Sequence, residues 1–237
     1  MPQSIFLALA TQYIDGQHTT AVHTGEWNLG TLDAGGAKLN LDRCLGSFDL
    51  RGAAQSGRPL TPTDTITAAD LILYCTAFLG PAGWAAWIER MTRADWDSAS
   101  GNWNNYKAGS AWTAAGGDVG TSPAPLAFSS PSVSGDQTIT GMLAFVTDAI
   151  ANRSGKVLLR LRANDESPTA GTKWAAYAAD PALAQAPRLR VTYESADPAP
   201  IERPAHIGGD GAAHVAPTAR VASANRSARP DRADRGR

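Results

Sequence analysis

The chain has 237 residues, and its 21 Lys and Arg residues nearly balance its 22 Asp and Glu residues, which gives a net charge of −1. This length suits one large all-β domain or two small domains. The near-neutral charge excludes a bulk attraction to nucleic acid or to an acidic membrane, so neither is expected as a partner.

The first predicted element is a strand from Ile5 to Tyr13, within the apolar run MPQSIFLALATQYIDG. No Lys or Arg precedes this run, so it lacks the charged start of a secretory signal peptide, and we interpret it as part of the fold. No stretch of the sequence is long enough to span a bilayer. Without a recognisable signal peptide, we expect either a protein of the extracellular or virion surface or one that stays inside the cell.

Further segments with short or alternating apolar runs are predicted to be strands, because clusters of Gly, Pro, Asn and Asp separate them. They span residues 45–50, 67–79, 83–91, 138–146, 156–163 and 187–194. Glu and Lys, which favour helices, are scarce, whereas Gly, Pro, Thr and Ser are plentiful. Short strands joined by turns predict an all-β sandwich or barrel.

The two cysteines, Cys44 and Cys75, each lie in a strand-like run, and we interpret them as small core residues. A disulfide between them would require Cα atoms within about 7 Å, which the sequence leaves open. A zinc site would need more Cys or His residues at ligand spacing, and His18 and His23 have no cysteine near them.

Residues 95–118, DWDSASGNWNNYKAGSAWTAAGGD, form a segment that we call the Trp loop. It places Trp96, Trp103 and Trp112 among Asn, Gly, Ser and Asp, with no helical apolar stripe. Because Trp is costly to leave in water, such a loop is either pinned to a core or presents aromatic faces to a ligand. We expect Trp96, which follows a strand-like segment, to be the buried anchor, and Trp103 or Trp112 to be more exposed.

Ala144 to Asn152 is the segment predicted to be a short helix. Its apolar residues do not alternate, and the sequence Asn152-Arg-Ser-Gly155 is typical of a helix end. The predicted fold is therefore a β-sandwich that carries one short helix.

The two last predicted strands carry arginines at alternate positions, opposite a face of apolar residues. This period of two predicts one face on the core and one in water. The arginines are Arg160, Arg162, Arg188 and Arg190. If the two strands are neighbours, like charges lie together, which an anionic ligand or nearby carboxylates would have to relieve.

The composition changes after Glu194, because residues 195–237 contain no aromatic residue and few large aliphatic ones. Such a segment cannot bury enough surface to offset the entropy of ordering. We predict one domain over residues 1–194 and a disordered tail, rich in Pro, Ala and Arg, over residues 195–237. Its terminal arginines indicate either a solvated tail or an arm that docks on an acidic partner.

Common catalytic motifs are missing from the sequence, including G-x-S-x-G, H-E-x-x-H, the Walker loop and a dinucleotide fingerprint that opens a helix. Asp95, Asp97 and Asp118 are available for a glycosidase pair, but Asp in a Gly- and Asn-rich loop is usually a turn former. We therefore expect no enzymatic activity and no cofactor. Loop Asp and Asn residues would suit a structural calcium ion, although no EF-hand-like loop identifies its ligands.

Several segments carry a family resemblance, of which the strongest is RADWDSASGNWNNY followed by Trp112 and GGD. The others, in chain order, are ATQYIDG, LDRCLGSFDL, ITAADLILYC, FVTDAI and DPALAQAPRLRVTYE. Together they cover roughly Ala10 to Glu194 and resemble the DNRLRE modules, a bacterial and phage family related to an alginate-binding carbohydrate module. The sequence departs from the family pattern at two places. The family usually has a Trp at the end of the short helix, where this chain reads AIANRSG, and its penultimate strand often contains Phe-x-Ser-x-Glu, where this chain has Trp174-Ala-Ala-Tyr177-Ala178.

This resemblance implies a non-catalytic, jelly-roll β-sandwich from an extracellular protein or a phage-like particle. The first functional hypothesis is a surface module that binds a glycan, in particular an acidic polysaccharide. Aromatic rings stack on sugars and arginines bind carboxylates, so the candidate ligand-binding residues are Trp103, Tyr106, Trp112, Arg160, Arg162, Arg188 and Arg190. The alternatives are that the tryptophans are core residues and that the arginines pair with nearby Asp and Glu. The second hypothesis is a structural phage virion protein, such as a tail, spike or capsid decoration subunit, whose partners are other virion or surface proteins.

Overall fold

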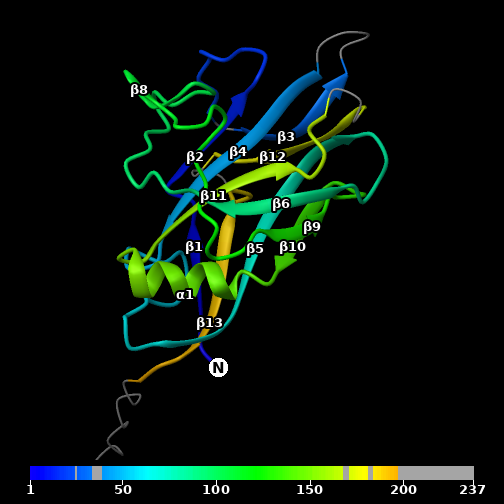
Figure 1. Ribbon diagram of the computed structural model, residues 1–237. Helices are drawn as coiled ribbons and strands as arrows, with labels where there is room; N and C mark the ends of the chain where they lie inside the picture. The colour runs from blue at the N-terminus through cyan, green and yellow to red at the C-terminus, as the bar shows by residue number, and fades with distance from the viewer. Residues whose placement is uncertain (25, 34–38, 168–170, 181–183, 197–237) are drawn as a thin grey trace, which may run out of the picture. The chain divides into compact units, whose positions relative to one another are not determined.

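The computed structural model describes residues 1–24, 26–33, 39–167, 171–180 and 184–196. Most of the tail predicted for residues 195–237 lies outside these residues. Strands dominate the described part, as the sequence predicts (Figure 1). They are β1 (Gln3–Leu7), β2 (Ala10–Asp15), β3 (Glu26–Asp33), β4 (Leu39–Asp49), β5 (Thr65–Leu79), β6 (Ala85–Arg90), β7 (Asn105–Lys107), β8 (Ser110–Ala111), β9 (Leu126–Ser129), β10 (Gly135–Thr140), β11 (Lys156–Ala163), β12 (Lys173–Ala178) and β13 (Arg188–Glu194).

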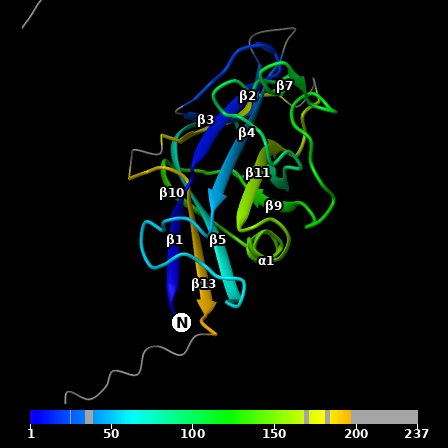
Figure 2. The same cartoon turned by 90° about the vertical axis from the view of Figure 1, so that its left-hand side faces the viewer.

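The strands form one strongly curled antiparallel sheet in the order β1-β13-β5-β12-β3-β4-β11-β6-β9. Strand β10 pairs with β5, and strand β2 pairs with β4. Strands β7 and β8 form a separate hairpin within the Trp loop. The curl brings β5 and β13 opposite β4 and β11, so the fold is the predicted jelly-roll-like β-sandwich (Figure 2).

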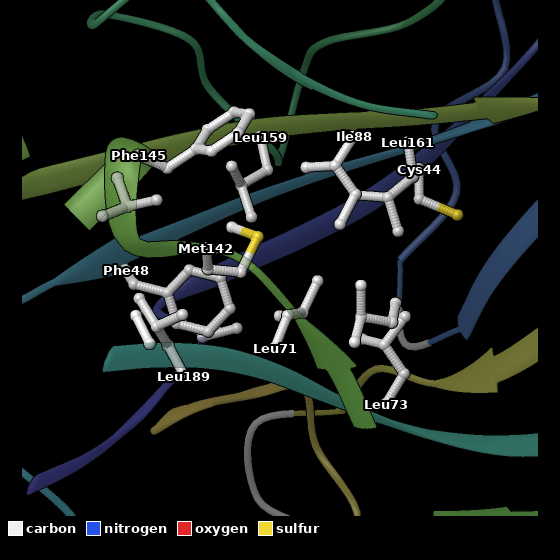
Figure 3. Packing of buried hydrophobic residues seen from close by; sticks show 14 of the residues in the cluster. Cys44, Phe48, Leu71, Leu73, Ile88, Met142, Phe145, Leu159, Leu161 and Leu189 are labelled. Atoms are coloured by element: carbon white, nitrogen blue, oxygen red, sulfur yellow. The ribbon is translucent and has the colours of Figure 1, made fainter. Parts of the chain in front are cut away.

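The main core fills the space between these two layers. Leu71, Leu73 and Leu189 from one layer point toward Phe48 and Leu159 from the other (Figure 3). Burial of such side chains stabilises a fold by about 1.5–3 kcal/mol each, so this interface is the main source of stability. Cys44 and Cys75 are buried free thiols, which confirms their interpretation as core residues.

The helix α1 (Leu143–Asn152) confirms the predicted helix, which begins one residue earlier than expected. Its buried residues, which include Phe145 and Ile150, face the core, and the helix packs against β5 and β11, one strand from each layer. It ends where Ser154 and Gly155 adopt positive φ and the N–H of Gly155 donates to the Ala149 carbonyl at 2.8 Å.

The predicted first strand, Ile5 to Tyr13, is in fact two strands. Strand β1 pairs with β13 in one layer, whereas β2 pairs with β4 in the other. The chain crosses between the layers near Leu9, whose side chain is exposed. The apolar pattern continues through this crossing, so the pattern alone does not reveal the change of partner.

Candidate functional site

The Trp loop covers the outer face of the layer that contains β2, β4 and β11, as both views show (Figures 1 and 2). Outward side chains of this layer meet the loop in a second hydrophobic cluster that includes Ile14, Leu45, Leu158 and Trp112. The prediction that the outer face of β11 is in water is therefore wrong, because Leu158 is buried under the loop. On β13, by contrast, buried residues alternate with partly exposed ones, as predicted.

The expectation that Trp112 could be the exposed tryptophan is wrong. Trp112 is only 5% exposed, and its indole N–H donates to the Asn102 carbonyl at 2.8 Å. Trp96 and Trp103 are both half-buried at the edge of the same cluster. Trp96 is anchored, because its indole N–H donates to Gln12 Oε1 at 3.0 Å, but it is not the most buried tryptophan of the loop, which the sequence predicts it to be.

The rings of Trp103 and Tyr106 already contact cations. The guanidinium carbon of Arg43 lies 4.6 Å from the centroid of the Trp103 ring. Arg93 and Lys107 lie 4.7 and 5.3 Å from the centroid of Tyr106. Cation–π contacts of this kind hold a ring in place and occupy part of the surface on which a sugar could stack.

Arg160 is buried rather than presented to solvent. It lies opposite Glu89 on β6 and donates through Nε and Nη2 to Glu89 Oε2, at 2.9 and 2.6 Å. Its Nη1 donates to the carbonyls of Gly116 and Gly117 in the Trp loop. Arg162 donates to the second oxygen of the same carboxylate at 3.1 Å. Burial lowers the pKa of Arg160, and the charge of Glu89 opposes that shift. Arg160 therefore joins the Trp loop to the sheet.

The two strands that carry the four arginines do not meet the condition of being neighbours. Strand β11 pairs with β4 and β6, whereas β13 pairs with β1 and β5, so the two strands are not neighbours. Arg188 pairs with Asp136 at 2.6 Å and Arg190 pairs with Asp70 at 2.7 Å. The alternative that the arginines pair with nearby carboxylates is confirmed.

A cleft of about 590 Å³ opens beside the Trp loop, next to Arg160. Its lining residues are Thr92, Arg93, Thr113, Ala114, Gly117, Asp118, Val119 and Arg160. Arg93 donates through Nε to Asp118 Oδ2 at 2.9 Å and through Nη2 to Thr113 Oγ1 at 3.0 Å. Within the described residues, its Nη1 makes no hydrogen bond, and its side chain is 36% exposed.

Asp118 is the fixed acceptor of this cleft. Its carboxylate also accepts from the backbone N–H groups of Thr113 and Ala114, at 3.0 and 2.8 Å. Burial raises the pKa of Asp118, but these hydrogen bonds and that of Arg93 outweigh burial, so the pKa is lowered overall. The cleft therefore offers an ionised carboxylate beside a guanidinium group with a free donor.

The structure brings five of the seven candidate ligand-binding residues to one side of the sandwich. Trp103, Tyr106 and Trp112 lie in the second cluster, Arg160 lines the cleft, and Arg162 shares the Glu89 carboxylate with Arg160. Sequence reasoning missed Arg93, whose partner Asp118 lies 25 residues later. The sequence signal that could have pointed to Arg93 is its place two residues before the Trp loop begins at Asp95. Arg188 and Arg190 lie in other surroundings, on β13.

Metal binding and membrane insertion can both be examined in the described residues. No three His, Cys, Asp or Glu side chains among them are arranged to hold a metal ion. No helix among them combines the length and the apolar character needed to cross a membrane.

Comparison with known proteins adds no assignment, since no family model matches the chain and no curated protein matches it. The resemblance to the DNRLRE modules remains a prediction from the motifs.

Proposed function

We propose that this protein is a non-catalytic β-sandwich module, of the kind that the DNRLRE resemblance implies, and that it binds an acidic glycan in the cleft beside the Trp loop. The observation that carries the proposal is the pairing of Arg93 with Asp118 in an open cleft. Glycan hydroxyl groups both donate and accept hydrogen bonds, so a site with a fixed donor and a fixed acceptor suits them.

We assign the contact with the acidic group of the ligand to Arg93. Its free Nη1 can donate to a carboxylate, and hydrogen bonds between charged groups are shorter and stronger than neutral ones. Thr92 and Thr113 line the same cleft and supply hydroxyl groups. This differs from the stacking hypothesis, because Trp112 is buried and Trp103 contacts Arg43.

The state of Asp118 supports binding rather than hydrolysis. A glycosidase needs one carboxyl group with a raised pKa that can act as a general acid. Hydrogen bonds hold the pKa of Asp118 below its ordinary value. An ionised carboxylate can accept hydrogen bonds from a sugar but cannot protonate a glycosidic oxygen. A ligand of this class would place the protein at an extracellular or virion surface.

The proposal is tested by titration with a uronic-acid polymer such as alginate and with a neutral glucan, at low and at moderate salt. Binding to the acidic polymer should weaken with salt, because exposed charges are screened over about 8–10 Å. Arg93→Ala should weaken it by about 10- to 100-fold, the range expected when a hydrogen bond to a charged group is lost.

Arg190→Ala is a matched control, because Arg190 and Arg93 are both 36% exposed and both pair with an Asp. It should leave the affinity unchanged. If no acidic glycan binds at low salt, the proposal fails and the structural virion subunit becomes the better hypothesis. If Arg190→Ala weakens binding as much as Arg93→Ala, the cleft is the wrong site.

A further inference from the structure

Two buried carboxylates face each other across the β2–β4 pair. Asp15 lies directly opposite Asp42 in the antiparallel register. Such partners project from the same face of a sheet, with Cβ atoms roughly 4.5–5.5 Å apart. Asp15 is 2% exposed and Asp42 is 1% exposed. Within the described residues, Oδ1 of Asp42 is buried without a hydrogen-bond partner.

The surroundings favour the neutral form of Asp42. Burial and then the charge of Asp15 raise its pKa to about 7, while the indole N–H of Trp174 and the ring of His18 oppose the shift. Neither Trp174 Nε1 nor Asp42 Oδ1 makes a hydrogen bond of normal geometry among the described residues. A negative charge on a buried cross-strand neighbour disfavours the ionised form of Asp42, as burial does.

Asp15 has its own contacts. It accepts from the backbone N–H of Gln17 at 2.6 Å and contacts Nδ1 of His18 at 2.5 Å. The His18 side chain is 63% exposed. The other described titratable groups that act on the pair or lie beside it are Tyr13 on β2, Cys44 on β4, Glu26 on β3 and His23.

The chain neighbours of both aspartates support the Trp loop. Gly16 follows Asp15, and a Cβ atom placed on Gly16 would lie 3.4 Å from Trp103 Cζ2. Arg43 follows Asp42, lies over the Trp103 ring, and donates to the Gly116 carbonyl at 2.8 Å. A change in the pairing of β2 with β4 at this end would therefore alter the contacts of Trp103 with Gly16 and Arg43.

We propose that the Asp15–Asp42 pair is a proton-dependent latch in which protonated Asp42 holds the end of β2 against β4. Loss of that proton to solvent leaves two buried negative charges that repel, which loosens this end of the sandwich and the contact with Trp103. A neutral Asp42 can donate its O–H to a carboxylate oxygen of Asp15. The latch does not depend on a glycan ligand.

The direction of the pH effect follows from the raised pKa. The folded protein holds a proton on Asp42 that the unfolded chain releases near its ordinary value of 3.8. The stabilisation is therefore complete below that value and is lost as pH rises through about 7.

The first test is a carbon-13 NMR titration of the Asp carboxyl carbons in the full chain, from pH 3 to pH 9. Asp42 should titrate with a midpoint near 7, and the Trp103 indole signal should shift over the same range. A midpoint for Asp42 near 4 would overturn the latch. This measurement uses the wild-type protein, so it does not depend on whether a variant folds.

The second test compares thermal unfolding midpoints between pH 5 and pH 8. The wild-type midpoint should fall over this range, whereas Asp42→Asn, which is neutral at every pH, should show a smaller fall and a higher midpoint at pH 8. Asp136→Asn is the control, because Asp136 is 55% exposed and should keep the wild-type slope. An unchanged slope in Asp42→Asn would assign the effect to His18 or another group and would overturn the proposal.

The third test measures the same unfolding midpoints in the presence of calcium chloride. If calcium at pH 8 restored the midpoint of the wild type but not that of Asp42→Asn, the pair would be a cation site, and the proton latch would be wrong. No effect of calcium on either protein supports the latch.

Discussion

Trp112 and Trp96 hold the Trp loop in different ways. Trp112 lies inside the cluster formed with Leu45 and Leu158, so nearly all of its side chain is removed from water. Trp96 is half-buried at the edge, and its main fixed contact is the hydrogen bond to Gln12. At the scale of single residues, burial therefore makes Trp112 the stronger anchor, although the position of Trp96 after a strand-like segment predicts the opposite order.

Replacement of these residues should give unequal losses of stability. Trp112→Ala should reduce the free energy of unfolding by about 3–5 kcal/mol, the usual cost of removing a buried Trp side chain. Trp96→Ala should cost less, because part of its ring is already in water. Urea denaturation of both variants measures the difference, and a larger loss for Trp96→Ala would contradict the assigned burial.

At the scale of elements, the sequence predicts the strands and the helix whose formation depends on a local pattern of apolar and turn residues. Strands β5, β6, β11 and β13 and the helix α1 appear where apolar runs and turn residues place them, whereas the run over residues 45–50 marks only the second half of β4. The predicted strand over residues 138–146 is wrong beyond Thr140, because residues 143–146 belong to α1. Strand β3 was not predicted, because its apolar residues are few and Gly30, at a φ of 120°, interrupts it. The faces of β11 could not be predicted either, because the covering Trp loop is distant in sequence.

Strand β4 contains a glycine whose role only the packing explains. Trp27 of β3 is fully buried, and a Cβ atom on Gly46 would lie only 2.7 Å from its Cη2 atom. Gly46→Ala should therefore lower the free energy of unfolding by about 1–3 kcal/mol through overpacking.

A double-mutant cycle checks this contact. Trp27→Phe removes the part of the ring that an added Cβ would meet, so Gly46→Ala should cost less in the Trp27→Phe background than in the wild type. Equal costs in both backgrounds would show that the collision is not the cause.

At the scale of the whole molecule, one outer face of the sandwich carries both the candidate cleft and the contacts of Trp103 that the Asp15–Asp42 latch would loosen. Arg43 and Arg160 both donate to the Gly116 carbonyl, so β4 and β11 hold the Trp loop at the same point. The sequence could indicate that this loop matters, because its tryptophans stand in a polar context. It could not reveal the cleft, which depends on the contact of Arg93 with the distant Asp118.

The most direct measurement is NMR mapping of a uronic-acid oligosaccharide on the labelled full chain at low salt. We predict shift changes at the Arg93 side-chain Nε and at the amides of Thr113 and Asp118, with none at Arg188 or Arg190 on β13. Changes centred on β13, or no change at any ligand concentration, would contradict the assignment of the cleft as a glycan site.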